Sequence, residues 1–267
     1  MHTTPLTVTS RDGTTIAYDK VGHGPPVILV AGALCSRSSW SGPELAHLLA
    51  PRFTVYNYDR RGRGDSGDTQ PYAVMREIED IEALIDAADG SACLYGHSSG
   101  AALALEATVR LGTKVKRLAM YEAPYNDDPA AQQAWKDYLK HLSEALAAGR
   151  RGDAVALFLR YTGMPADQID RMRQTPTWPM FEAIAPTLAY DHAAILGDDA
   201  AVPADLAARV NVPALVMSGA VSYPFMHDTA RALGKAMPNA QVRSLEGQTH
   251  AVDVDVLAPV LMEFFGT

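Results

Sequence analysis

The segment Gly96-His97-Ser98-Ser99-Gly100 constrains the fold of this chain strongly, because of what lies on either side of it. Residues 91–95 form a short apolar run typical of a buried strand, and residues 101–111 are rich in alanine and leucine. This order predicts a strand, a sharp turn and a helix, with Ser98 at the turn. The flanking glycines leave room for a strained backbone at Ser98. We therefore expect the Ser98 hydroxyl to be exposed above the sheet, with His97 pointing away from it.

A serine hydroxyl reacts poorly at neutral pH unless a histidine accepts its proton and a carboxylate orients that histidine. His250 has the most informative position among the eight histidines, since a strand-like run at 241–245 and a loop at 246–249 precede it and a helical pattern at 252–265 follows. Catalytic groups gather at the carboxyl ends of parallel strands, where both Ser98 and His250 are expected. We predict His250 as the base. His192 and His227 could touch a substrate, although solvent or packing roles are favoured for both.

The organisation of the chain predicts an α/β protein with an insertion. Apolar runs alternate with helical patterns over residues 27–120 and from residue 214 onward. Residues 124–209 contain no strand-like run; residues 131–148 and 153–161 have helical spacing instead, and prolines interrupt the pattern further on. The 267 residues, 48% of them hydrophobic, are enough for one sizeable core. We predict a core of residues 1–123 and 210–267 and a helical lid of residues 124–209.

Three stretches together resemble the α/β-hydrolase fold superfamily over nearly the whole chain. Residues 27–33 resemble the strand and His-Gly turn that supplies one oxyanion donor, with Ala31 in place of the histidine. Residues 59–66 are similar to the Asp-x-Arg-Gly-x-Gly-x-Ser segment, and residues 96–100 to the nucleophile elbow. The resemblance implies a mostly parallel, twisted sheet of about eight strands flanked by helices. It also implies an oxyanion hole formed by the backbone N–H groups of Ala33 and Ser99, with Leu34 a near-equal candidate for the first donor.

The triad acid departs from the commonest pattern of the superfamily. Ser222 occupies the position where an aspartate is expected, and a serine cannot hold an imidazolium by charge. Haloalkane dehalogenases and some lipases place the acid after the strand that follows the elbow helix, which here is residues 115–120 with Glu122 at its end. We therefore expect Glu122 to be the acid, with Asp228 as the alternative. A purely structural role, in which Glu122 accepts backbone N–H bonds at the start of the lid, also fits.

These assignments predict a serine hydrolase that cleaves an ester, lactone, thioester or related acyl bond through an acyl-enzyme intermediate. The dehalogenase nucleophile is an aspartate, so a chain with Ser98 at that position is not expected to catalyse dehalogenation. The alternative is a member of the same fold without acyl-enzyme chemistry, such as an epoxide-opening or cyclising biosynthetic enzyme or a ligand-binding relative. A small, largely apolar substrate is expected under the lid. Residues expected to line its site are Leu34, Tyr125, Trp178 and Phe181.

Other functions are disfavoured by composition and context. Residues 62–67 spell G-x-G-x-x-G, but no helix follows at once and two aspartates would repel a phosphate, so we expect no nucleotide or other cofactor. No His/Cys cluster has metal-ligand spacing, and the two cysteines are expected to be reduced. A net charge of −8 opposes binding to nucleic acid or an acidic membrane. No apolar stretch is long enough to span a membrane and residues 1–5 do not resemble a leader, so we expect a cytoplasmic protein.

Overall fold

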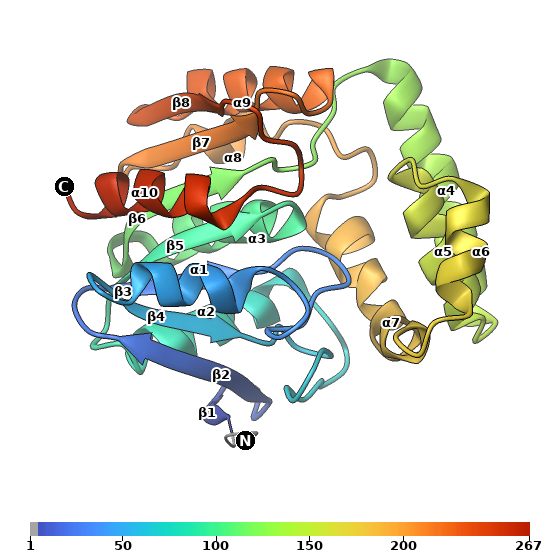
Figure 1. Cartoon of the computed structure of the whole chain (residues 1–267), viewed down its shortest axis with the longest axis horizontal. Coiled ribbons are helices and arrows are strands. Elements are labelled where there is room, and N and C mark those ends of the chain that lie inside the picture. The colour runs from blue at the N-terminus through green and yellow to red at the C-terminus, as the bar shows by residue number, and fades with distance from the viewer. Residues whose placement is uncertain (1–4) are drawn as a thin grey trace.

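The structure, a computed structural model, describes residues 5–267; residues 1–4, on which part of the expectation of no leader depends, lie outside this range. Within it, eight strands form one sheet in the order β1-β2-β4-β3-β5-β6-β7-β8 (Figure 1). β2 is antiparallel to both of its neighbours, and all other pairs are parallel. The prediction of a mostly parallel sheet of about eight strands is confirmed. The strands are β1 (Leu6–Thr9), β2 (Thr15–Gly22), β3 (Pro26–Val30), β4 (Thr54–Tyr58), β5 (Ala92–His97), β6 (Val115–Tyr121), β7 (Ala214–Gly219) and β8 (Ala240–Leu245).

Helices cover both faces of this sheet, as Figure 1 shows. The first and last helices, α1 (Gly42–Leu49) and α10 (Val254–Phe265), pack together on one face. The other face carries α2 (Val74–Asp86), α3 (Ser99–Leu111), α8 (Ala204–Ala207) and α9 (Pro224–Ala236), with the short turn η1 (Gly112–Lys114) after α3. A parallel sheet covered on both faces needs strands that are apolar on both sides.

Strand β3 illustrates how the sequence meets this requirement. Val27 and Leu29 belong to the core cluster beneath α1 and α10. Ile28 and Val30 point to the opposite side and belong to the larger cluster beneath α2 and α3. All four side chains are fully buried, because consecutive residues of a strand face opposite sides of the sheet.

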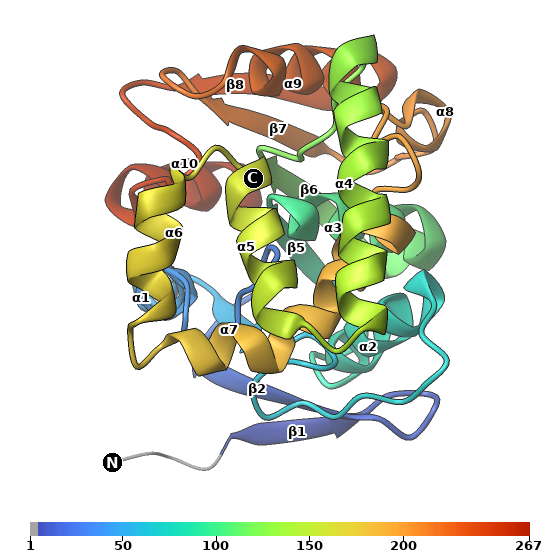
Figure 2. The same ribbon diagram turned by 90° about the vertical axis from the view of Figure 1, so that its right-hand side faces the viewer.

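The chain between β6 and β7 is mostly helical and lies beyond the carboxyl ends of the parallel strands (Figures 1 and 2). Its elements are α4 (Pro129–Ala147), α5 (Arg151–Tyr161), α6 (Ala166–Arg173), α7 (Trp178–Ile184), η2 (Ala185–Thr187) and the π-helix η3 (Tyr190–Ile195). The helical spacing at 131–148 and 153–161 corresponds to α4 and α5. Helix α8, although it falls within residues 124–209, packs against α3 and α9. In the described part of the chain no helix combines the length and apolar character that crossing a membrane requires.

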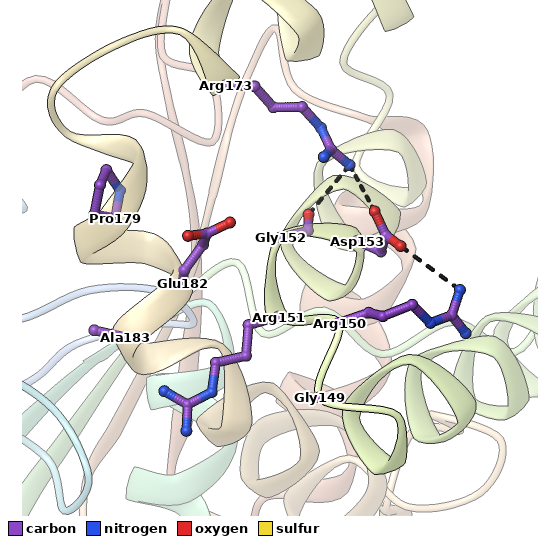
Figure 3. A pocket seen from close by; sticks show the side chains of 9 residues that line it. All are labelled: Gly149, Arg150, Arg151, Gly152, Asp153, Arg173, Pro179, Glu182 and Ala183. Atoms are coloured by element: carbon purple, nitrogen blue, oxygen red, sulfur yellow. Dashed lines mark hydrogen bonds and ion pairs between the residues drawn. The ribbon is translucent and has the colours of Figure 1, made fainter.

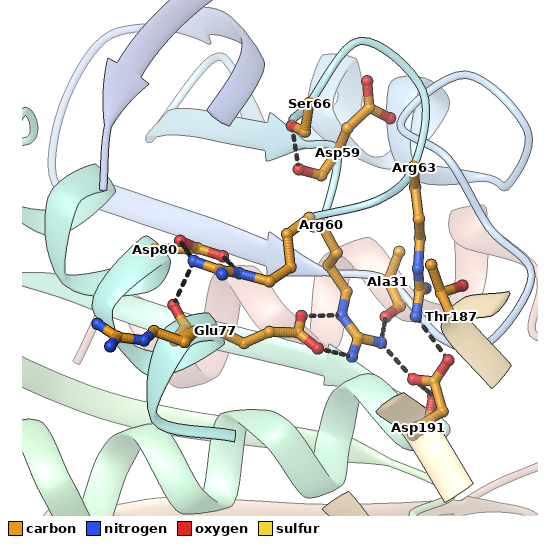
Figure 4. A network of polar contacts seen from close by, with 12 residues as sticks. Ala31, Asp59, Arg60, Arg63, Ser66, Glu77, Asp80, Thr187 and Asp191 are labelled. Atoms are coloured by element: carbon orange, nitrogen blue, oxygen red, sulfur yellow. Dashed lines mark hydrogen bonds and ion pairs between the residues drawn. The ribbon is translucent and has the colours of Figure 1, made fainter. Parts of the chain in front are cut away.

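A network of buried charges follows β4 (Figure 4). Arg60 donates two hydrogen bonds of 2.7 Å to Glu77 of α2, and Arg61 binds Asp80 of the same helix at 2.8 and 2.7 Å. Arg60 and Arg63 also bind Asp191 of η3, at 2.6 and 2.5 Å. These six residues are at most 1% exposed. The network therefore joins the turn after β4 both to α2 and to the helical insertion.

The G-x-G-x-x-G segment lies in this turn, and α2 begins only at Val74. Gly64 has a φ of +52°, and a Cβ atom there would lie 2.2 Å from Asp59 Oδ2. The glycine thus allows the chain to fold back over Asp59, as expected for a turn.

Candidate active site

Ser98 lies at the sharp turn between β5 and α3, with φ of 56° and ψ of −128°. Two glycines make this turn possible. A Cβ at Gly96 would lie 2.4 Å from the carbonyl oxygen of Gly100, and a Cβ at Gly100 would lie 2.2 Å from that of Val30. The Ser98 N–H donates to the Tyr121 carbonyl of neighbouring β6 at 2.9 Å. The strained backbone expected at Ser98 is therefore held by contacts to both adjacent strands.

His250 and Glu122 meet at the carboxyl ends of the strands. His250 Nδ1 lies 2.7 Å from Glu122 Oε2, although the residues are far apart in sequence. Glu122 directly follows β6, is 2% exposed and has a φ of 49°. The loop between β8 and α10 carries His250. The two residues that the sequence analysis paired are thus in direct contact.

Two further donors hold the Glu122 carboxylate. The Gly219 N–H donates to Oε1 at 2.8 Å, and the Ser222 hydroxyl donates to Oε2 at 2.9 Å. Burial alone would raise the pKa of Glu122, but the hydrogen bonds from His250, Gly219 and Ser222 outweigh it and hold the pKa below its usual range. Glu122 is therefore ionised at neutral pH. Asp228, the alternative acid, lies on α9 in an exposed ion pair with Arg231.

His97 does not point away from the site, and that expectation was wrong. Its ring lies 5.0 Å from the ring of His250 in an edge-on arrangement and also contacts Trp40 and Tyr121. Burial and the neighbouring His250 lower the pKa of His97 to about 3. The Tyr121 hydroxyl of β6 donates to the Thr249 carbonyl at 2.5 Å and so ties the loop that carries His250 to the strand beside β5. His97 is therefore a neutral neighbour of His250.

Most of the candidate catalytic residues line one cavity of about 650 Å³. Ser98, His97 and His250 line it, as do Ala33 and Ser99, the two expected oxyanion donors. Neither the Ala33 nor the Ser99 backbone N–H donates a hydrogen bond to a group in residues 5–267. The remaining wall comes largely from the insertion and the loop after β7, and includes Trp135, Phe158, Tyr161, His192, Leu196, Tyr223, Phe225 and Met226.

The four residues expected to contact substrate do not line this cavity. Leu34 and Tyr125 are 6% and 2% exposed and belong to the main core cluster. Trp178 donates to Glu182 within α7 at 2.9 Å, and Phe181 packs beside it. The expectation was wrong because Trp178 and Phe181 of α7 pack within the insertion, whereas Trp135 of α4 and Phe158 and Tyr161 of α5 line the cavity that contains Ser98. His192, for which a packing role was favoured, does line the cavity, whereas His227 binds Ser218 outside it.

A second cavity, of about 590 Å³, lies within the insertion between the start of α5 and α7 (Figure 3). Polar residues dominate it, and Arg173 spans it by binding Asp153 at 3.0 Å. It shares no lining residue with the Ser98 cavity. Over residues 5–267, no group of three or more His, Cys, Asp or Glu side chains is arranged to hold a metal ion. Cys35 and Cys93 are both free thiols.

Comparison with known proteins identifies the class of protein that this fold and site define. Residues 27–259 match the model of the alpha/beta hydrolase family, and the chain belongs to that family. The resemblance seen in the sequence is thereby confirmed.

Individual relatives agree with this assignment. An alpha/beta hydrolase from Sphaerobacter thermophilus is 49% identical, and the match covers 97% of this chain and all of that one, with a TM-score of 0.86. A hydrolase from Pseudomonas aeruginosa (23% identical, 98% of both chains, TM-score 0.75) and an esterase from Rhodococcus sp. (19%, 99% of both, 0.70) share the fold. A putative non-heme bromoperoxidase of Mycobacterium tuberculosis is 30% identical over 95 residues, which span 35% of this chain and 36% of that relative.

Proposed function

We propose that this protein is a serine hydrolase that cleaves an ester, or a related lactone or thioester, of a small, largely apolar substrate. The hydrogen bond between His250 and the buried, ionised Glu122, at a cavity that also contains Ser98, carries this proposal. A histidine so oriented presents its other nitrogen as a base. Family membership and the esterase neighbour support the same class of reaction.

The proposed reaction proceeds through an acyl-enzyme. His250 takes the proton of Ser98 as the serine oxygen attacks the substrate carbonyl, and the N–H groups of Ala33 and Ser99 bind the oxyanion. His250 then protonates the leaving group, and a water activated by the same histidine releases the acid. No hydrogen bond joins Ser98 to His250 among the described residues, so the proposed reaction requires the two side chains to approach further when substrate binds, as is common for catalytic pairs.

Helices α4 to α7 serve in this proposal as a lid over the reaction. They lie beyond the carboxyl ends of the strands (Figure 2). Trp135, Phe158 and Tyr161 from α4 and α5 form part of the cavity wall. An apolar wall excludes water from the acyl-enzyme and favours an apolar substrate. We accordingly retain residues 1–123 and 210–267 as the core and residues 124–209 as the lid insertion.

Labelling with a fluorophosphonate tests the proposal. The protein should react covalently at one site, and Ser98→Ala should abolish labelling while Ser99→Ala should not. Glu122→Gln should slow labelling without loss of folding, as judged by circular dichroism. Folded protein that is neither labelled nor active on aryl esters would overturn the proposal and favour a member of the fold without acyl-enzyme chemistry.

A further inference from the structure

His192 is a buried polar side chain in the wall of the Ser98 cavity, and the proposed reaction does not use it. It is 3% exposed and belongs to the π-helix η3. Its ring centroid lies 5.3 Å from that of Trp135, 5.4 Å from that of Tyr138 and 5.1 Å from that of Phe158. Aromatic rings thus surround the imidazole and fix its orientation before a ligand binds.

The hydrogen bond to Tyr138 determines which nitrogen of His192 carries the proton. His192 Nδ1 lies 2.9 Å from the Tyr138 hydroxyl, which has no other hydrogen-bond partner among residues 5–267. A buried hydroxyl hydrogen without an acceptor is unfavourable, so Tyr138 donates to Nδ1. Burial lowers the pKa of His192 to about 4, so the ring is neutral at neutral pH and holds its one proton on Nε2.

The Nε2–H group of His192 is free to bind a ligand. The Nε2 atom has no hydrogen-bond partner in the described chain. It is not among the fully buried polar atoms that lack a partner, so it is accessible to a ligand. His192 lines the cavity, whereas Tyr138, on the Nδ1 side of the ring, does not. The donor therefore opens onto the cavity that contains Ser98.

The residue before His192 anchors this donor to the core (Figure 4). Asp191 is fully buried and accepts hydrogen bonds from Arg60, Arg63 and the Ser99 hydroxyl at 2.6, 2.5 and 2.8 Å. Ser99 is the residue after the nucleophile, so the same carboxylate is bonded to the elbow. The distance between His192 and Ser98 is thereby fixed by the core as well as by the helices of the insertion.

The rest of the cavity wall favours a neutral ligand with an aromatic or other flat apolar group. Five aromatic residues line it: Trp135, Phe158, Tyr161, Tyr223 and Phe225. Of the residues that line it, none is a lysine or arginine, and Asp199 adds a carboxylate. An anionic ligand would therefore enter without a counter-charge, which costs free energy in a desolvated site.

We propose that His192 donates a hydrogen bond from Nε2 to a neutral oxygen of the substrate. The favoured substrates then have an apolar, ring-bearing body with a ketone or ether oxygen that is separate from the scissile carbonyl. This inference rests on the proposed function for the identity of the scissile bond as an ester. The subsite itself is defined by binding and can be measured without turnover.

Binding to the Ser98→Ala protein provides the test. The ligands are N-methyl amides of 4-oxo-4-phenylbutanoic, 5-oxo-5-phenylpentanoic and 6-oxo-6-phenylhexanoic acids, each compared with the amide in which the ketone is a methylene. Calorimetry gives the ratio of dissociation constants within each pair. Because a neutral hydrogen bond is involved, we expect at least one keto amide to bind about fivefold to tenfold more tightly than its partner.

Variants of His192 assign that preference to Nε2. Tyr138→Phe/His192→Phe removes the donor without leaving the Tyr138 hydroxyl unpaired, and it should bring the ratio close to one. His192→Gln retains an N–H donor and should keep part of the preference. The matched control is His227→Phe, since His227 also binds a hydroxyl through Nδ1 but lies outside the cavity. It should leave the ratio unchanged.

The outcomes separate this inference from the proposed reaction. The subsite is refuted if no pair shows a preference, if the preference survives Tyr138→Phe/His192→Phe in folded protein, or if none of the amides binds. A preference that depends on His192 in the Ser98→Ala protein, combined with a parent protein with Ser98 intact that neither hydrolyses the matching p-nitrophenyl esters nor reacts with a fluorophosphonate, would support the subsite and refute the esterase. Melting temperatures of all variants establish that they are folded.

Discussion

Replacing Asp191 by asparagine tests how the helical insertion is held to the core. The substitution keeps the size of the side chain but removes its charge. Arg60 retains its two hydrogen bonds to Glu77. Arg63 retains only the Gly32 carbonyl at 2.6 Å, and its Nε atom is buried without a partner. The variant therefore leaves one fully buried guanidinium without a compensating carboxylate.

The expected loss of stability follows from that uncompensated charge. Breaking a buried ion pair from one side typically costs about 3–5 kcal/mol. Denaturation by urea at pH 7, followed by tryptophan fluorescence, measures the loss as a lower midpoint at constant slope. Asp228→Asn is the matched control, since Asp228 pairs with Arg231 at the surface and its loss should cost at most about 1 kcal/mol. If the two variants are equally stable, the argument from buried charge is wrong.

The contribution of the Asp191 charge to the free energy of unfolding should also depend on pH. Burial on its own raises the pKa of Asp191, but Arg60 and Arg63 outweigh it and lower the pKa from 3.8 to about 2. A carboxyl with a lowered pKa stabilises the fold fully above its unfolded value, and this stabilisation disappears as the pH falls through the folded value. The stability difference between the protein and Asp191→Asn should therefore shrink between pH 3.8 and about 2. A difference that is constant over this range would contradict the assignment of the charge to Asp191.

Three further variants test the site. Glu122→Gln should lower kcat for aryl esters by about 10⁴-fold with little change in melting temperature, whereas Asp228→Asn should be nearly silent; the reverse result would transfer the acid role to Asp228. Ser222→Ala removes one of the hydrogen bonds that lower the pKa of Glu122, so kcat should fall by about tenfold; unchanged kcat would mean that this bond does not help to orient the carboxylate. Gly100→Ala places a Cβ 2.2 Å from the Val30 carbonyl oxygen and should destabilise the protein by at least about 1–3 kcal/mol; a melting temperature within about 1 °C of the parent would show that the turn is looser than described.

Local patterns predicted the elements that carry the candidate triad, because each such signal lies within a few residues. The strand-turn-helix around Ser98 follows from apolar runs and two glycines. The placement of His250 follows from its position between a strand-like run and a helical one. Glu122 was predicted from the resemblance to haloalkane dehalogenases and some lipases, which place the acid at the end of this strand; periodicity alone did not pair it with His250.

Long-range packing accounts for what the sequence did not predict. A segment containing Arg60, Arg61 and Arg63 has the composition of an exposed turn, and it is buried because carboxylates from α2 and from η3 meet it. The partner of Arg63 lies 128 residues away. The cavity wall was misassigned for the same reason. Aromatic residues recur at helical spacing in several segments of the insertion, and only the docking of α4 and α5 decides that Trp135, Phe158 and Tyr161 line the cavity that contains Ser98.

The position of Glu122 explains how a triad acid can be present in the proposed enzyme although Ser222 stands where an aspartate is usual. Strands β6 and β7 are direct neighbours, with Tyr121 opposite Met217, so the residues that follow them emerge side by side at the sheet edge. Glu122, which follows β6, therefore reaches His250 Nδ1 at 2.7 Å from the strand next to the one that usually carries the acid. The loop after β7 contributes to the arrangement in a different way, since Gly219 and Ser222 donate hydrogen bonds to Glu122. The residue at the usual acid position, Ser222, therefore donates a hydrogen bond to the acid instead of being the acid. His250 is still oriented by a carboxylate, although that carboxylate follows β6 instead of β7.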